Sequence, residues 1–251
     1  MPDDSPPTVP AWDFYPCKVD QAPASILVDL SLGEPSAERV GEVLYVVRIL
    51  MAEPGEHGMG EPAEFEVLGP LEERLASGAA AHGARFVGRL RNQGRWQVAF
   101  MGPRGIEDAL GNLGLELLDP TGRDHDLVFQ EDPTWSYFDG FLYPDPERLR
   151  WMRDRALVEA LREGGDDPAA VRRVDHHLEL PTRTARNAAA GEAIDLGFRA
   201  VDPAPGERSA LHLHHEDRVE LEHVHVVVMG LSALAAKHGG RYVGWTSEAA
   251  R

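Results

Sequence analysis

The pattern of hydrophobic and polar positions in the first half of the chain predicts strands interleaved with two helices. Apolar or alternating runs predict five strands, at residues 26–30, 43–50, 84–91, 95–101 and 125–130. Asn92-Gln93-Gly94 separates the third run from the fourth, which is typical of a β-hairpin turn. The order β-β-α-β-β-α-β predicts an α+β sandwich.

The two helices of the first half are predicted from apolar spacing. One apolar set recurs at intervals of three and four and predicts an amphipathic helix to about Ala81, with the positions Phe65, Leu68, Leu71 and Leu75. Pro70 interrupts this set, so the helix could instead begin near that proline. Residues 106–113 predict the second helix. The carboxylate pairs Glu72-Glu73 and Glu107-Asp108 are interpreted as surface charge near helix starts.

The second half predicts a leading helix and then an alternation of strands and helices. The helices are expected at residues 149–161, 182–196 and 221–238, and the strands at 171–180, 198–201, 210–215 and 241–245. Gly164-Gly165, Gly197 and Gly239-Gly240 mark the three helix ends. After the leading helix the order is β-α-β-β-α-β, the split-βαβ order of ferredoxin-like domains.

A run of aromatic residues between two prolines marks the boundary between the halves. Its members are Trp135, Tyr137, Phe138, Phe141 and Tyr143. We interpret this cluster as a hydrophobic clasp that holds the connecting segment onto its domain, with a ligand platform as the alternative. The predicted domains are residues 12–144 and 145–251, after a flexible leader at 1–11.

Composition narrows the class of protein. The net charge is −17, with 10 basic and 25 acidic residues in 1–146, so the first half is expected to repel phosphates and not to bind nucleic acid directly. The single cysteine, Cys17, rules out an intramolecular disulfide. No apolar run is long enough for a membrane helix, and residues 1–10 lack the pattern of a signal peptide. A soluble, cytoplasmic protein is expected, and the arginine bias suggests a high-GC bacterial genome.

Several short motifs of the second half resemble those of the RraB family, regulators that inhibit ribonuclease E by binding it. The motifs, in order, are Gly165-Asp166-Asp167-Pro168, His176-His177-Leu178, Leu196-Gly197-Phe198 with Val201-Asp202-Pro203, and Tyr242-Val243-Gly244-Trp245. The resemblance covers about residues 149–247. It implies a protein partner, by resemblance a ribonuclease, and a ferredoxin-like domain without a catalytic role or cofactor.

The first half is similar to a bacterial domain of unknown function that often precedes RraB-like domains. The resemblance rests on Asp132-Pro133-Thr134-Trp135 followed by Tyr137 and on the exit Leu142-Tyr143-Pro144. RraB proteins also carry a strongly acidic C-terminal tail, whereas this sequence ends at Arg251, six residues after Trp245. We therefore expect any electrostatic help in partner binding to come from the acidic first half.

Aromatic and histidine residues are the candidates for a site in the second half. Tyr242 and Trp245 are large, rigid groups of the kind enriched at interfaces, and with His176 and His177 they are the predicted partner-binding residues. A core role is the alternative for each. His212 and His214 would share one face of a strand and are weak candidates for half of a metal site.

Three hypotheses of function are left open by these patterns. The leading one is a non-catalytic regulator that binds a ribonuclease of the E type and modulates RNA turnover. A second is a metal-dependent enzyme that uses the histidine-rich segment 211–225. On a helix His223 and His225 point about 200° apart, so they are not expected to chelate one ion together. A third is a structural or self-assembling module, with a homodimer as its simplest form.

Overall fold

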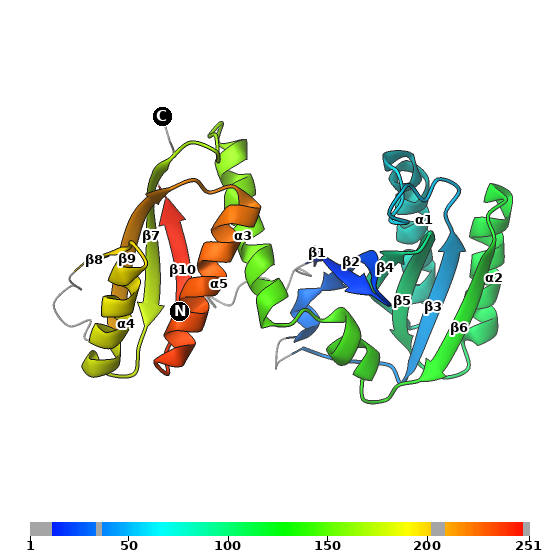
Figure 1. Cartoon of the computed structure of the whole chain (residues 1–251). Helices are drawn as coiled ribbons and strands as arrows, with labels where there is room; N and C mark the ends of the chain where they lie inside the picture. The colour runs from blue at the N-terminus through cyan, green and yellow to red at the C-terminus, as the bar shows by residue number, and fades with distance from the viewer. Residues whose placement is uncertain (1–11, 34–36, 202–208, 248–251) are drawn as a thin grey trace, which may run out of the picture. The chain divides into compact units, whose positions relative to one another are not determined.

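The computed structural model describes residues 12–33, 37–201 and 209–247, and it divides the chain into two compact units, 1–145 and 146–251 (Figure 1). Both units combine helices with antiparallel sheets, so the predicted α+β class is confirmed. The leader 1–11 and Asp202-Pro203 lie outside the described residues.

The first unit contains one six-stranded sheet in the order β1-β2-β4-β5-β3-β6, and every neighbouring pair is antiparallel. Its elements are β1 (Trp12–Val19), β2 (Ala22–Asp29), η1 (Leu30–Gly33), β3 (Val43–Leu50), α1 (Pro62–Ala81), β4 (Arg85–Asn92), β5 (Arg95–Gly102), α2 (Glu107–Leu118), η2 (Asp119–Thr121), β6 (His125–Glu131) and η3 (Phe138–Leu142).

The predicted order of the first unit was wrong at its start, because strand β1 was missed. β1 and β2 form a hairpin whose turn residues Asp20 and Gln21 have φ of 50° and 65°. A turn of this kind normally has Asn or Asp followed by Gly, and Gln21 stands where that Gly is expected, so the turn signal is weak. The second hairpin was predicted, and its turn residues Gln93 and Gly94 have φ of 48° and 75°.

Helices α1 and α2 cover one face of the first sheet and enclose its main core. Trp96, Tyr45 and Phe100 are among its largest buried side chains. α1 begins at Pro62, earlier than expected, because proline fits the first turn of a helix. It also continues through Pro70, and α2 runs on to Leu118, past the predicted end at residue 113.

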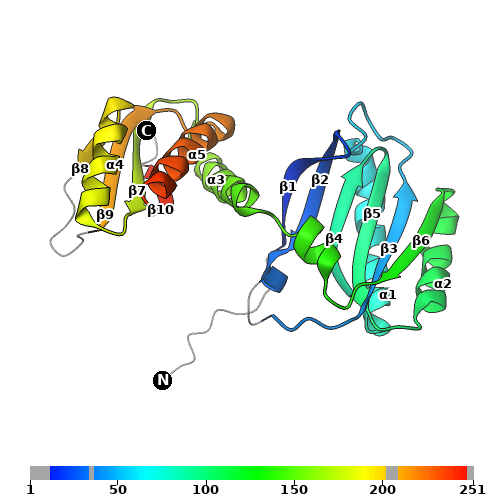
Figure 2. The same cartoon turned by 60° about the horizontal axis from the view of Figure 1, so that its bottom comes forward.

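The second unit has the predicted element order, α-β-α-β-β-α-β. Its elements are α3 (Pro146–Glu163), β7 (Arg172–Glu179), α4 (Arg183–Asp195), β8 (Arg199–Val201), β9 (Ala210–Asp217), α5 (Leu221–Lys237) and β10 (Arg241–Ser247). The sheet order is β10-β7-β9-β8, with all neighbours antiparallel. Figure 2 shows the three helices on the same side of this sheet. Their apolar residues and the inward side chains of the strands form the second core.

Candidate functional site

The sheet face opposite the helices in the second unit is the surface on which histidines gather. We call it the outer face, and it comprises Asp175 and His177 of β7, Arg199 and Val201 of β8, and His212 and His214 of β9. The outward side chains alternate with buried ones along β7 and β9, as in any half-covered sheet. None of the six is buried, and Val201 is 38% exposed.

Cross-strand register brings the outer-face histidines together. His177 lies opposite His212, with their ring centroids 4.9 Å apart and the rings nearly perpendicular, and Asp175 lies opposite His214. The Arg173 guanidinium beside Asp175 holds the pKa of that carboxyl below its usual range. The outer face therefore combines half-buried imidazoles, an ion pair and an exposed apolar side chain.

Three of the four predicted partner-binding residues lie inside the second core. His176 is 0% exposed, and Tyr242 and Trp245 are each 4% exposed, whereas His177 lies on the outer face. The His176 Nδ1 atom lies 2.7 Å from the Tyr242 hydroxyl oxygen. Burial lowers the pKa of His176 to about 3, with a further contribution from His215, so its imidazole is neutral at pH 7. Contact with a partner stays a prediction for all four, and the buried three would act by supporting the sheet.

Asp154 connects the helices to the last strand, and sequence reasoning did not identify it. Its carboxylate is 3% exposed; Oδ1 accepts a hydrogen bond from Trp245 Nε1 at 2.9 Å, and Oδ2 lies 2.8 Å from His225 Nδ1. Burial raises the pKa of Asp154, although both partners oppose this. One sequence feature could have indicated this burial. Asp154 lies four positions before Val158, which places it on the same buried stripe of α3.

A second carboxylate, that of Asp217 at the end of β9, contacts two histidines. Asp217 Oδ2 lies 3.1 Å from His215 Nε2 and 2.9 Å from His223 Nε2. Burial would raise the pKa of Asp217, but hydrogen bonds from His223, the Arg218 backbone and His215 outweigh burial and lower the pKa. His223 and His225 thus contact different carboxylates. Within the ranges 12–33, 37–201 and 209–247, no three His, Cys, Asp or Glu side chains are placed to hold a metal ion, and this includes His212 and His214.

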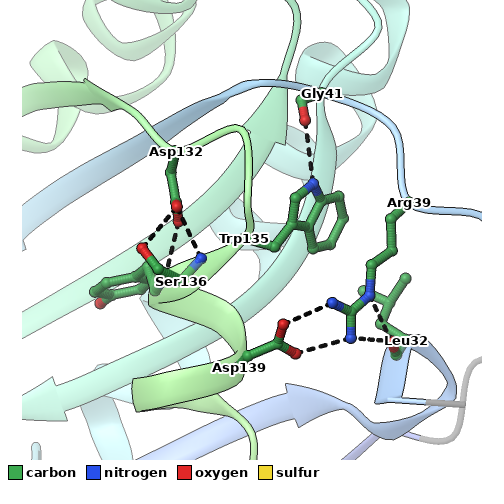
Figure 3. A network of polar contacts seen from close by, with 8 residues as sticks. Leu32, Arg39, Gly41, Asp132, Trp135, Ser136 and Asp139 are labelled. Atoms are coloured by element: carbon green, nitrogen blue, oxygen red, sulfur yellow. Dashed lines mark hydrogen bonds and ion pairs between the residues drawn. The ribbon is translucent and has the colours of Figure 1, made fainter.

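The aromatic run at the end of the first unit is the predicted clasp (Figure 3). Trp135, Phe138 and Leu142 are buried at 3%, 0% and 0% exposure, which confirms the packing interpretation. The Asp132 carboxylate accepts bonds from the backbone of Ser136 and Tyr137, and so holds the turn in which Trp135 has a φ of 58°.

Leu32, Arg39 and Gly41 contact this clasp from another part of the first unit. The Trp135 indole donates to the Gly41 carbonyl at 3.1 Å. Arg39 forms two bonds of 2.8 Å with Asp139 and also donates to the Leu32 carbonyl, as Figure 3 shows. These contacts join the aromatic segment to Leu32, Arg39 and Gly41, as expected for a clasp that fixes a chain segment.

One carboxylate of the first unit contradicts the sequence interpretation. Glu72 was expected on the surface, but it is 7% exposed and accepts a bond of 2.7 Å from Trp96 Nε1. Arg89 pairs with it at 3.0 Å, while burial raises the pKa of Glu72 against these contacts. Glu107 agrees with its prediction, because it lies in the first turn of α2.

Comparison with known proteins assigns both units to families. Residues 151–247 match the family "Regulator of ribonuclease activity B" (RraB), and residues 10–143 match a family of unknown function, DUF695. A protein named Regulator of ribonuclease activity B from Xenorhabdus nematophila is 31% identical over 109 residues, which cover 40% of this chain and 77% of that protein. The protein of that name from Escherichia coli K12 is 30% identical over 109 residues, 40% of this chain and 79% of the relative.

The chain therefore belongs to the RraB family through its second unit and to DUF695 through its first, and both predicted resemblances are confirmed. The relatives' names support a regulatory role connected with ribonuclease activity. None of the helices in the described parts of the chain is both long and apolar enough to span a membrane.

Proposed function

We propose that this protein is a non-catalytic, cytoplasmic regulator that binds a ribonuclease of the E type and modulates RNA turnover. The observation that carries the proposal is the match of residues 151–247 to the RraB family, together with relatives named as regulators of ribonuclease activity. The RraB-like unit is the partner-binding part in this proposal, since the similarity to those relatives covers that part of the chain.

The outer face is the proposed contact surface of the RraB-like unit. α4 and α5 cover the opposite face, where buried side chains of β7, β9 and β10 pack against them. His177 and His212 meet at the middle of the outer face, and imidazole rings can donate, accept and stack. Tyr242, Trp245 and His176 would then act as positioning residues that hold β7 and β10 in register from within.

Paired substitutions of surface histidines test this surface. The double variant His177→Ala/His212→Ala in the full chain is expected to weaken binding to purified ribonuclease E at least about tenfold, as removal of a central contact does. His57→Ala removes an exposed histidine from the loop before α1 and serves as the control. Calorimetry of binding and inhibition of RNA cleavage are the two measurements. Unchanged binding of the double variant would exclude the outer face, and no binding by the unmodified chain would exclude this partner.

The acidic first unit is the proposed source of long-range attraction. Residues 1–146 carry 25 acidic and 10 basic side chains, whereas the rest of the chain is nearly balanced. Attraction to a basic partner segment is screened by salt, so the association rate is expected to fall several-fold between about 0.05 and 0.3 M ionic strength. Stopped-flow kinetics checks this, and a rate independent of salt would remove the first unit from the proposal.

A further inference from the structure

The two edge strands of the first sheet differ in how they are protected. β1 contains Pro16 and Lys18, two residue types that discourage a further strand from pairing. β6 contains neither, and within the described residues it pairs only with β3. Val128 and Phe129 of β6 are 37% and 55% exposed. An edge of this kind is a template for another strand.

We propose that β6 pairs antiparallel with β6 of a second copy of this chain, around a two-fold axis at Val128. A homodimer of this kind is isologous, so the same edge serves both copies and leaves no β6 edge free. The proposal concerns the DUF695 unit and is independent of ribonuclease binding.

Hydrogen bonds at the two ends of β6 show which backbone groups are available. Leu50 N donates to the Asp124 oxygen and Asp132 N donates to the Glu42 oxygen, both at 2.8 Å. In an antiparallel ladder the directly bonded pairs alternate with unbonded ones, so residues 124, 126, 128, 130 and 132 direct their amides toward β3. The N–H and C=O groups of the odd residues therefore point outward: His125, Leu127, Phe129 and Glu131.

A two-fold axis at Val128 gives these outward N–H and C=O groups hydrogen-bond partners in the second copy. Leu127 then faces Phe129 of the second copy, and His125 faces Glu131 of the second copy, so that each outward residue meets another outward residue. Val128 faces its own counterpart as an unbonded pair, in which the Cα atoms approach to about 4.5 Å. A shift by one residue would place outward groups opposite inward ones and lose these bonds.

Side chains along the edge complement each other in this register. A hollow of ≈ 350 Å³ between α2 and β6 is lined by Leu110, Leu115 and Leu127, among others. Phe129 of the second copy, opposite Leu127, would lie beside this hollow and cover apolar surface, including Leu115, which is 52% exposed. The opposite-charge pair of His125 with Glu131 adds to the match when the histidine is protonated.

Charge on the edge does not prevent this pairing. Asp126 is paired with Arg48, and Glu131 lies 3.0 Å from Arg104, so both carboxylates of the strand already have a cation. The remaining repulsion is the long-range repulsion between two acidic units, which salt screens. Dimerisation is therefore expected to strengthen with salt, opposite to the salt dependence of ribonuclease binding.

Cysteine cross-linking tests the register in the full chain, with Cys17→Ser as the background. Val128→Cys is expected to form an intermolecular disulfide under mild oxidation, because the two-fold axis brings the residue against its own copy. Gln130→Cys is the matched control on the same strand face, and its counterpart is residue 126 of the second copy, so little cross-linking is expected. Cross-linking of Gln130→Cys without that of Val128→Cys would overturn the register.

Sedimentation across a concentration series tests the dimer itself. Phe129→Lys is expected to raise the dimer dissociation constant at least about tenfold. Phe14→Lys, on the other edge strand, is expected to leave the constant unchanged. Urea unfolding of each variant establishes that the first unit is folded. An unmodified chain that stays monomeric up to millimolar concentration overturns the proposal, and β6 would then be open to a strand of a different protein.

Discussion

Each unit packs its helices on one face of an antiparallel sheet, but the two units differ in what covers the opposite face. In the first unit the clasp, residues 132–143, covers β2 and β4 on that face, with Leu142 directly above Gly88. In the second unit the corresponding outer face carries half-exposed polar side chains. The first sheet is therefore partly covered by its own chain on this face, whereas the described residues of the second unit leave the outer face half-exposed.

The buried polar groups differ in one respect. Both units bury carboxylates against arginines, as in Glu72 with Arg89 in the first unit and Asp166 with Arg172 in the second. The second unit also buries a neutral imidazole, His176, and directs Asp154 to a tryptophan and a histidine. Arginine keeps its charge at any ordinary pH, but histidine does not. Sensitivity to mild acid is therefore expected mainly in the second unit.

The largest loss of stability is expected from a substitution that breaks the clasp. Trp135→Ala removes a buried indole and its hydrogen bond to Gly41, so the free energy of unfolding of the first unit is expected to fall by about 3–5 kcal/mol. Urea unfolding followed by NMR signals from each unit measures it, with the signals of the second unit unchanged. Phe14→Ala, at a residue 40% exposed, is the control and is expected to cost less than about 1.5 kcal/mol. Equal losses for the two variants would show that the clasp does not close the sheet.

A smaller effect is expected at the Asp154 carboxylate. Asp154→Ala leaves the Trp245 N–H and the His225 ring nitrogen without their partner, at a cost of about 3 kcal/mol to the second unit. Asp154→Asn keeps an oxygen acceptor for Trp245 and is expected to lose about half as much. Thermal unfolding of both variants is the measurement. If the alanine variant were as stable as the parent, the carboxylate would have no role in holding α3 to β10.

Mild acid is expected to destabilise the second unit by about 1.5 kcal/mol between pH 6.5 and 5. The pKa of His176 falls from 6.5 when unfolded to about 3 when folded, so below pH 6.5 only the unfolded state takes up the proton. This contribution to stability is complete about one pH unit above 6.5 and is lost at up to about 1.4 kcal/mol per pH unit as the pH falls toward 3. The lowered pKa of Asp217 adds a loss only below its ordinary value of 3.8.

Replacement of the titrating group provides the control for this pH dependence. His176→Gln keeps a polar group for the Tyr242 hydroxyl and cannot take up a proton in this range. Its unfolding free energy in the second unit is expected to vary less between pH 6.5 and 5 than that of the parent. Urea unfolding at a series of pH values measures both, and an equally steep slope in the variant would assign the proton uptake to another group.

Local sequence signals were sufficient for the second unit and for most of the first. Gly197 and the other helix-ending glycines, with the spacing of apolar residues, placed every element of the RraB-like unit in order. β1 was missed because its hairpin uses Asp20-Gln21 in a left-handed turn and because Pro16 lies within the strand. Both are exceptions to the local rules by which strands are recognised.

The buried polar contacts could not be predicted for a different reason. Asp154 meets its partners 71 and 91 residues further along the chain, and Glu72 meets Trp96 across 24 residues. An acidic residue on a helix is normally a surface residue, and only the tertiary partner makes its burial favourable. The burial of Tyr242 and Trp245 follows the same logic, because an aromatic pair near a strand end fits a core and an interface equally well.

The smallest expected effect concerns a helix cap. The Thr182 hydroxyl accepts a hydrogen bond from Ala185 N at 3.1 Å and caps α4, whereas α1 and α2 begin without a side-chain cap. Thr182→Ala is expected to lower the stability of the second unit by about 1 kcal/mol, while Thr184→Ala, inside the same helix and exposed, is expected to change it by less than about 0.5 kcal/mol. Thermal unfolding resolves this difference. Equal effects would mean that packing against β8 and β9, and not the cap, determines where α4 begins.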